Sequence, residues 1–136
     1  MRHYNVVGAV IVQNGKIMAA RRGTQMSQPG KWEFPGGKIE PGETTEQALV
    51  RELREEMRCD VRVGAKINTH TEHYDFGTVT LSCFYCELAN NSAQPTLLEH
   101  SEIRWLNPHN SAALLALDWA AADIPAVHQI IADFAN

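Results

Sequence analysis

The segment from residue 34 to residue 57, FPGGKIEPGETTEQALVRELREEM, constrains the fold more than any other part of the chain. Thr44 and Gln47 form a capping-box pattern, in which each side chain bonds the backbone N–H of the other residue, so we predict that a helix begins here and runs to about Met57. The apolar side chains of this segment recur at the spacing of one helical face, namely Ala48, Leu49, Leu53 and Met57. This face is expected to pack on a core.

The other face of the predicted helix is acidic. Glu52, Glu55 and Glu56 stand at positions i, i+3 and i+4, where a helix brings side chains onto one surface and like charges repel. They also lie near the C-terminal end, where the helix dipole disfavours anions. An ordinary solvated acidic face leaves this repulsion uncompensated, and Arg51 and Arg54 offset only part of it. A hard divalent cation such as Mg²⁺ prefers carboxylate oxygens, so the pattern predicts a metal site.

Length and charge narrow the classes of protein. A chain of 136 residues with 44% hydrophobic content can bury one core, and a single domain over 1–136 is expected. A net charge of −4 gives no broad attraction for nucleic acid or an anionic membrane. No apolar stretch approaches the roughly 20 residues of a membrane span. Three cysteines cannot all pair in disulfides, so we expect the protein in a reducing cytoplasm. We also expect a monomer or a weak homodimer.

The rest of the chain predicts a mixed β-sheet with a few helices, an α/β or α+β sandwich. Asn14-Gly15 is a favoured hairpin dipeptide between two apolar runs, and it predicts the first two strands. Further strands are expected over 61–68, 78–88 and 103–106. Helices are expected over 108–115 and 125–134, because each begins with a proline, whose missing N–H is harmless in a first turn.

Two other patterns are interpreted as structural. Cys83 and Cys86 spell C-x-x-C within an alternating strand, where residues three apart face opposite sides, so we expect two buried thiols and no zinc pair. The group His70, Glu72 and His73 is interpreted as a polar hairpin connection.

The acidic segment resembles a known family motif. Gly37, five residues, Glu43, seven residues and then REL-x-EE from Arg51 is similar to the Nudix box, and WEFPGGKIEPGE resembles the MutT branch of that family. The resemblance extends from the first strand to the last helix. It implies the Nudix fold, with a mixed sheet between helices, and a hydrolase of nucleoside diphosphates linked to another group. MutT-like members convert a nucleoside triphosphate and water to the monophosphate and pyrophosphate.

The chain departs from this motif at one position. The box has glycine two residues after its last glutamate, and here Arg58 stands there. Glycine suits the left-handed conformation that often ends a helix, so either Arg58 adopts that strained conformation or the helix ends differently. Stability is affected more than chemistry, because no metal ligand is lost.

The resemblance also implies roles for the acids. Glu55 and Glu56 would be the principal ligands of Mg²⁺, with Mn²⁺ as a substitute, while Glu52 would bind the metal directly or through water. The carbonyl of Gly36 would complete the protein's share. Arg51 would orient the carboxylates.

Two residues are candidates for the general base, which must reach the metal-bound water. Glu52 is one. Glu99 is the other, because LLEHSEIRWL resembles a MutT-branch segment whose loop glutamate, six residues before a tryptophan, returns to the metal. Without the resemblance Glu99 is equally well an ordinary surface acid. Glu43 is expected to be structural, at the entry of the helix.

The substrate is expected to meet residues outside the helix. Arg22 resembles a substrate-contacting arginine of the branch, although an Arg-Arg pair at a strand end is often only an edge. Glu33 and Phe34 border the glycine turn and are expected to line the nucleoside pocket. Asp123 falls where MutT uses asparagine to contact the base, but Asp two residues before Pro125 is also a good helix N-cap.

Ionised aspartate only accepts hydrogen bonds, so Asp123 suits an exocyclic amino group such as N4 of cytosine. The ADIP and ALVRELREE segments also resemble CTP pyrophosphohydrolase relatives of MutT, which favours CTP, dCTP or a 5-substituted dCTP as substrate. An 8-oxo-dGTP diphosphatase is the alternative. A non-catalytic nucleotide-binding module is the alternative from another class, although such modules commonly lose box acids that this chain retains. Isopentenyl-diphosphate isomerases and ADP-ribose hydrolases need elements that this short chain does not offer.

Overall fold

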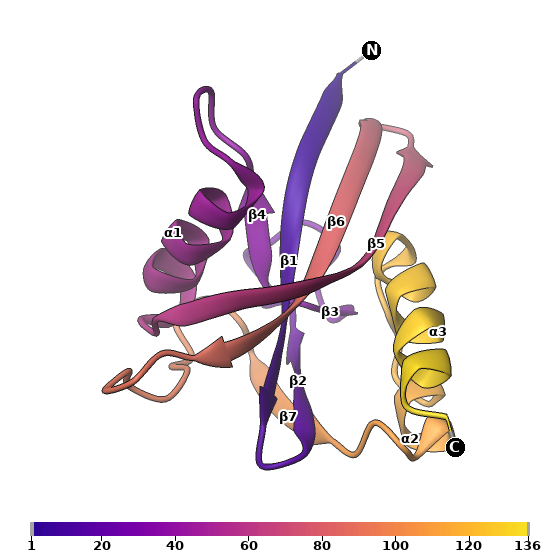
Figure 1. Cartoon of the computed structure of the whole chain (residues 1–136). Helices are drawn as coiled ribbons and strands as arrows, with labels where there is room; N and C mark the ends of the chain where they lie inside the picture. Colours follow the sequence, from indigo (N-terminus) through magenta and orange to yellow (C-terminus); the bar gives the residue numbers. More distant parts are fainter. Residues whose placement is uncertain (1, 136) are drawn as a thin grey trace.

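A mixed sheet lies between helices in the computed structural model, which describes residues 2–135 (Figure 1). The strands are β1 (His3–Gln13), β2 (Lys16–Arg21), β3 (Trp32–Glu33), β4 (Gly36–Lys38), β5 (Val61–Tyr74), β6 (Gly77–Leu88) and β7 (Glu102–Leu106). The helices are α1 (Thr45–Met57), α2 (Ser111–Leu115) and α3 (Ile124–Asp133), with a 3-10 turn, η1 (Ala121–Asp123). The expected α/β or α+β sandwich is confirmed.

The strands run in the order β3-β2-β1-β6-β5, with β4 also pairing β1 and β7 also pairing β2. β1 is parallel to β6, while the β1–β2, β1–β4 and β5–β6 pairs are antiparallel. Asn14 and Gly15 both have positive φ in the turn between β1 and β2, as the hairpin prediction requires. β1 therefore joins the two halves of the sheet, and α1 and α3 lie on opposite sides of it (Figure 1).

The core has two parts, one on each side of the sheet. Val10 of β1 packs with the buried residues of α3, whereas its neighbour Ile11 packs with those of α1, because successive strand residues face opposite sides. Cys83 belongs to the first part and Cys86 to the second, and both are buried. The interpretation of the C-x-x-C pattern as two separate core thiols is confirmed. Burial raises the pKa of Cys86 to about 12, which keeps this thiol protonated.

Helix α1 forms as the sequence predicts. The Thr44 side chain accepts a hydrogen bond from the Gln47 N–H at 3.1 Å, and the Gln47 side chain accepts one from the Thr44 N–H at 2.9 Å. The residues that the helix buries are those of the predicted apolar face, namely Ala48, Leu49, Leu53 and Met57. The capping box and this face together fix where the acidic side of the helix points.

The helix ends in the left-handed conformation that glycine would favour. Arg58 has φ 51° and ψ 38°, and its N–H donates to the Arg54 carbonyl at 3.1 Å. The Cys59 N–H donates to the Leu53 carbonyl at 3.4 Å. The chain therefore ends the helix with the turn of the motif although the glycine is absent. The left-handed conformation of Arg58 is strained, because its Cβ lies close to the following carbonyl oxygen.

Three expectations about elements need correction. The group of His70, Glu72 and His73 lies inside β5 and not in a connection, because β5 continues to Tyr74 and the turn comes only after it. His70 and Glu72 pair with each other along the strand at 2.9 Å, and His73 pairs with Thr78 across the hairpin at 3.1 Å. The short strands β3 and β4 were not expected as strands. Helix α2 begins at Ser111, later than the proline predicts, because the side chain of Asn110 caps it.

No helix within residues 2–135 is both long and apolar enough to cross a membrane.

Replacing Arg58 with glycine tests the strain at the end of α1. Glycine adopts φ near 50° without the Cβ clash, so R58G is expected to raise the free energy of unfolding by about 1 kcal/mol. Urea denaturation measures this change. As a control, E46G places glycine at an exposed position in the first turn of the same helix and is expected to lower stability, by up to about 1 kcal/mol, because it also removes a carboxylate from the positive end of the helix dipole. A loss of stability in R58G would contradict the account.

Candidate active site

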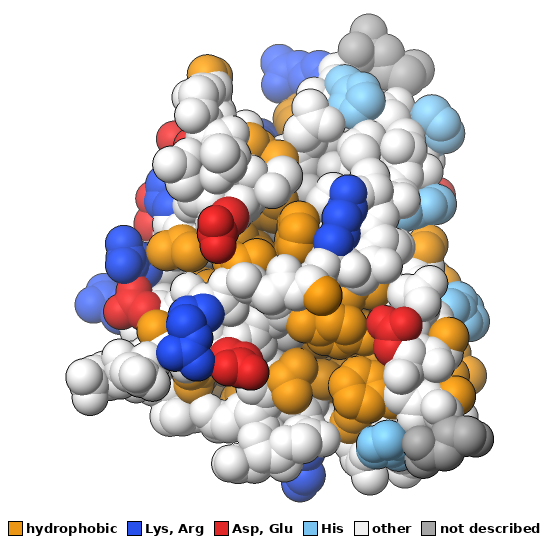
Figure 2. Space-filling view, in the orientation of Figure 1, with side chains coloured by type: hydrophobic (Ala, Val, Ile, Leu, Met, Phe, Trp, Pro, Cys, Tyr) orange, Lys and Arg blue, Asp and Glu red, His pale blue; other side chains and the backbone are white. Residues whose placement is uncertain are grey.

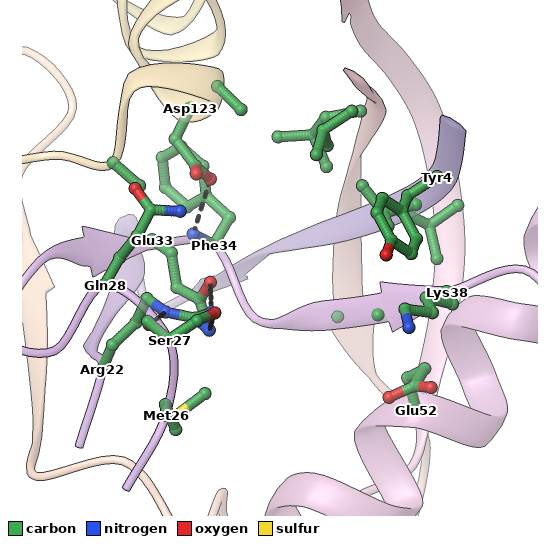
Figure 3. Close-up of a pocket in the computed structure, with 18 of the residues that line it drawn as sticks. Tyr4, Arg22, Met26, Ser27, Gln28, Glu33, Phe34, Lys38, Glu52 and Asp123 are labelled. Carbon is green, nitrogen blue, oxygen red and sulfur yellow. Dashed lines mark hydrogen bonds and ion pairs between the residues drawn. The ribbon is translucent and has the colours of Figure 1, made fainter. Parts of the chain in front are cut away.

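A cavity of about 870 Å³ opens between α1 and η1. Figure 2 shows one face of the molecule, where hydrophobic side chains gather near the centre and charged side chains lie around them. Most of the site residues expected from the sequence line the cavity: Arg22, Glu33, Phe34, Gly36, Glu52, Glu56, Glu99 and Asp123. They come from segments far apart in the sequence. Figure 3 shows two ends, with Glu52 at one and Asp123 at the other.

Arg51 lies behind the cavity and organises its acidic end. Its guanidinium donates to both carboxylate oxygens of Glu43, at 2.7 and 2.9 Å, and to the carbonyl of Lys38 at 3.0 Å. It also donates to Glu52 at 2.9 Å and Glu55 at 3.2 Å. One side chain therefore ties the helix, the loop before it and strand β4 together, as expected for a residue that orients carboxylates.

The hydrogen bonds from Arg51 and from the Glu40 N–H lower the pKa of Glu43 to about 2. Glu43 is thus ionised throughout the neutral range and stands at the entry of the helix, where a structural role was expected.

Glu56 has the most perturbed carboxyl group at this end. Burial and, after it, the nearby carboxylates of Glu33, Glu52 and Glu99 together raise its pKa to about 8. Three acids from three different segments therefore act on a fourth. Such a cluster is stable as anions only if something positive lies among them.

The donor set at this end suits a hard divalent cation. It consists of carboxylates and backbone carbonyls, which Mg²⁺ prefers to nitrogen or sulfur. A Cβ on Gly37 would overlap the carboxylate of Glu52, so glycine is required for that carboxylate to lie against strand β4. In residues 2–135, however, no three His, Cys, Asp or Glu side chains converge into a finished coordination shell.

The position of Glu55 is one reason why these side chains do not converge on a single point. It is exposed, does not line the cavity, and its carboxylate accepts from Arg51. The expected ligand pair of Glu55 and Glu56 is therefore not assembled, because Arg51 provides the positive charge nearest to Glu55. To serve as a metal ligand, the Glu55 carboxylate would have to leave Arg51.

Arg22 stands at the other end of the cavity and already has partners. Its guanidinium donates to Glu33 at 2.6 Å, to the Ser27 hydroxyl at 2.9 Å and to the Ser27 carbonyl (Figure 3). These bonds hold the loop that carries Met26 and Gln28 against the cavity. Arg22 is therefore more than a strand edge, and its side chain faces the space where a substrate would lie.

Asp123 is buried beside Phe34. Its Oδ1 accepts a hydrogen bond from the Phe34 N–H at 3.0 Å, and its side chain makes no bond to the first turn of α3 (Figure 3). Of its two interpretations, the helix cap is not the one that the side chain adopts. Burial, together with the charge of Glu33, raises the pKa of Asp123 well above its usual range.

Sequence reasoning missed two features of the cavity. Tyr4, Tyr74 and Phe76 form an aromatic cluster on its wall, with the Tyr74 and Phe76 rings stacked at 5.0 Å between centroids. His100 is the second, a buried histidine whose Nε2 lies 2.7 Å from Glu33. The aromatic residues lie in no motif, and strand alternation could have indicated only the faces of Tyr4 on β1 and Tyr74 on β5. His100 lies within the LLEHSEIRWL segment, but the resemblance of that segment gave it no role.

Replacing Glu56 with glutamine tests the electrostatics of the acidic end. Because the folded protein raises the pKa of Glu56 from 4.5 to about 8, ionisation of this group destabilises the fold as pH rises through that window. Without divalent metal, E56Q is expected to be more stable than the parent protein by roughly 1–3 kcal/mol near pH 8 and by nothing near pH 4.

Thermal unfolding across that pH range measures the gain. E46Q, at an exposed position of α1, is the matched control and is expected to show no pH-dependent gain. Mg²⁺ is expected to raise the unfolding temperature of the parent protein and not that of E56Q. A gain in E56Q that does not change with pH would contradict the cluster.

Comparisons with known proteins agree with the motif. The NUDIX domain model matches residues 1–129. The CTP pyrophosphohydrolase of Escherichia coli K12 is 36% identical over 97% of this chain and 94% of its own length. An 8-oxo-dGTP diphosphatase of Haemophilus influenzae is 31% identical over 96% of this chain and 93% of its own length.

Among solved structures, the solution NMR structure of DNA mismatch repair protein MutT, a Nudix hydrolase of methicillin-resistant Staphylococcus aureus 252, is similar to this chain. It is 48% identical with a TM-score of 0.76, over 97% of this chain and 98% of its own. The chain therefore belongs to the NUDIX domain family and is a Nudix hydrolase.

Proposed function

We propose that this protein is a Mg²⁺-dependent nucleoside triphosphate pyrophosphohydrolase that converts a (d)NTP and water to the (d)NMP and pyrophosphate, and that it acts on cytosine nucleotides. The observation that carries the proposal is the cavity, which has carboxylates at one end and the buried Asp123 at the other. A triphosphate needs a cation, and a base needs a polar partner in an apolar pocket. The whole chain, 1–136, would act as one domain, as a monomer or weak homodimer.

Glu52, Glu55, Glu56 and the carbonyl of Gly36 would hold the metal, with Mn²⁺ as a substitute. Bound there, a divalent cation neutralises phosphate charge and lowers the pKa of the attacking water. Arg51 keeps Glu52 on the cavity side of α1 through the 2.9 Å bond between them. The carboxylate therefore does not have to be ordered when the substrate binds.

In the proposed reaction, water adds to phosphorus and the anhydride bond between the α and β phosphates breaks. The proton from water passes to a carboxylate, either Glu52 or Glu99, which both line the cavity. Pyrophosphate leaves with the bridging oxygen. Arg22 would contact the phosphates after exchanging its bonds with Ser27, and Glu33 would border the nucleoside.

Asp123 supports cytosine as the base. Its Oδ1 is taken by the Phe34 N–H, so Oδ2 remains to accept a hydrogen bond. The exocyclic amino group of cytosine is such a donor, and its approach favours the ionised carboxylate. The similarity to the E. coli CTP pyrophosphohydrolase supports the same choice, with CTP, dCTP or a 5-substituted dCTP as substrate.

A second substrate, 8-oxo-dGTP, is favoured by one observation. Burial and the charge of Glu33 raise the pKa of Asp123, which favours the protonated carboxyl group more than in an exposed aspartate. A protonated carboxyl group presents a donor as well as an acceptor, as asparagine does. The similar diphosphatase of H. influenzae is named for that nucleotide.

The test is product analysis with CTP, dCTP, 5-methyl-dCTP, 8-oxo-dGTP and ADP-ribose in millimolar Mg²⁺. We expect monophosphate and pyrophosphate in equal amounts, fastest from a cytosine nucleotide, and a loss of kcat by at least 10²-fold in E56Q. Equal activity in E56Q would remove the proposed metal site. Binding of nucleotides without hydrolysis would instead support the non-catalytic module.

Replacing Asp123 with asparagine tests the base contact. Asparagine can still accept from the Phe34 N–H through Oδ1, but it adds a donor where the carboxylate accepts. The ratio of kcat/KM for dCTP to that for 8-oxo-dGTP is expected to fall by tenfold or more, with the Mg²⁺ requirement unchanged. Unfolding of the variant with an unchanged ratio would show that Asp123 serves only the fold.

A further inference from the structure

His100 follows Glu99 in the chain, and among residues 2–135 it is one of the two buried polar or charged residues, together with Asp123. The imidazole has no exposed surface, and its Nε2 lies 2.7 Å from Oε2 of Glu33. The other oxygen of Glu33 accepts from Arg22 at 2.6 Å. Glu33 thus joins the segment that carries Arg22 to the segment that carries Glu99.

The protonation of the ring follows from its partners. Nδ1 of His100 has no hydrogen-bond partner among residues 2–135, so a proton on Nδ1 would be a buried donor without an acceptor. A neutral imidazole with its proton on Nε2 donates to Glu33 and avoids that penalty. His100 therefore makes one hydrogen bond through its ring, in which Nε2 donates to Glu33.

Two backbone contacts hold the same segment from the other side. A Cβ on Gly23 would overlap the carbonyl oxygen of Glu99, so the Glu99 backbone lies directly on this glycine. The N–H of Ser101 donates to the Arg21 carbonyl at 2.9 Å. Residues on both sides of the Glu99 side chain are thus held in place, although Glu99 itself is exposed.

Before Glu99 the segment has one backbone anchor, a hydrogen bond from the Thr96 N–H to the Met57 carbonyl at 2.9 Å. Leu97 and Leu98, just before Glu99, are each exposed by nearly half, at 47% and 46%, and contribute little burial. Fixing the backbone of each residue costs roughly 1–2 kcal/mol in conformational entropy. Without the contacts of His100 and Gly23, the carboxylate of Glu99 would therefore sample more positions, and its time at the acidic end of the cavity would fall.

We propose that His100 is a positioning residue which, with Gly23, holds the carboxylate of Glu99 at the acidic end of the cavity. This inference rests on the proposed function, because that function gives Glu99 its role at the metal or as the base. The buried side chain of His100 does not line the cavity, so its effect would pass through Glu33 and the Glu99 backbone. Glu33 then has a second duty beyond bordering the nucleoside.

The first experiment compares H100L with H100Q. Leucine removes the donor to Glu33, whereas glutamine places an N–H donor near the position of Nε2. We expect H100L to lower kcat and the affinity for Mn²⁺ by tenfold or more, and H100Q to recover most of both. Mn²⁺ binding is followed by the electron paramagnetic resonance signal of the free ion, without nucleotide. E102Q, in β7 and paired only with Arg104, is the matched control and is expected to bind Mn²⁺ normally.

The second experiment is a double-mutant cycle with E99Q. If His100 acts by holding Glu99, then H100L has no further effect on Mn²⁺ affinity or kcat once the Glu99 carboxylate is gone. Independent losses that multiply in the double variant would overturn the proposal, because His100 would then act on something else. Normal Mn²⁺ affinity and kcat in E99Q alone would overturn it as well.

G23A reaches the same segment without touching the imidazole. Gly23 does not have positive φ, so alanine adds no backbone strain there. The only expected effect of its Cβ is to push against the Glu99 carbonyl. We expect G23A to weaken Mn²⁺ binding by tenfold or more, also without further effect in the E99Q background. This variant keeps the test decisive if H100L does not fold, and normal Mn²⁺ binding in G23A would overturn the proposal.

These measurements separate the inference from the proposed function. If the parent protein hydrolyses none of the nucleotides, the proposed function fails, while the Mn²⁺ cycle still reports on Glu99. If the parent hydrolyses them and E56Q does not, the function stands, and an H100L variant that matches E102Q refutes the inference alone.

Discussion

The guanidinium of Arg51 makes the interactions on which the acidic end of the cavity depends. An arginine offers five N–H donors in one rigid plane, and here they meet two oxygens of Glu43, the Lys38 carbonyl, and the carboxylates of Glu52 and Glu55. A lysine would supply the charge without this geometry. These bonds offset the repulsion between the neighbouring carboxylates of α1. The helix can therefore pack beside strand β4, which contains Gly36 and Gly37.

The remaining repulsion falls on Glu56, which Arg51 does not contact. Its pKa is raised because the folded protein disfavours the ionised form of this buried group beside three other carboxylates. The size of a pKa shift measures the free energy by which the folded state disfavours ionisation. Active sites commonly keep such unfavourable groups at the expense of stability, since removing them removes the chemistry. Arg58 shows a different kind of strain, in the backbone, which has no evident part in the chemistry. The two are separable, because one depends on charge and the other on φ.

The fold was predictable where the signals were local. The capping box, the apolar face of α1 and the Asn14-Gly15 turn each depend on a few neighbouring residues, and each appears as expected. β3 and β4, of two and three residues, depend on pairing with β2 and β1, so no local periodicity indicated them. The length of β5 likewise depends on partners across its hairpin.

The site followed the same division. Helical spacing put Glu52 and Glu56 on one side of α1, and both line the cavity. It did not indicate that Glu55 pairs with Arg51, since the helix leaves the rotamers of a long side chain open. Nor could it indicate the role of His100, because the hydrogen-bond partner of this histidine, Glu33, lies 67 residues away in the sequence. Long-range contacts of this kind decide whether a histidine is a surface residue or a buried donor.

We propose that a divalent cation binds between strand β4 and helix α1. The most direct test is the broadening of backbone amide signals in the NMR spectrum as Mn²⁺ is added without nucleotide. We expect the signals of Gly36, Gly37, Glu52 and Glu56 to broaden first, and excess Mg²⁺ to restore them. Broadening that begins instead at His70 and His73 on β5, or that Mg²⁺ does not reverse, would contradict this proposal.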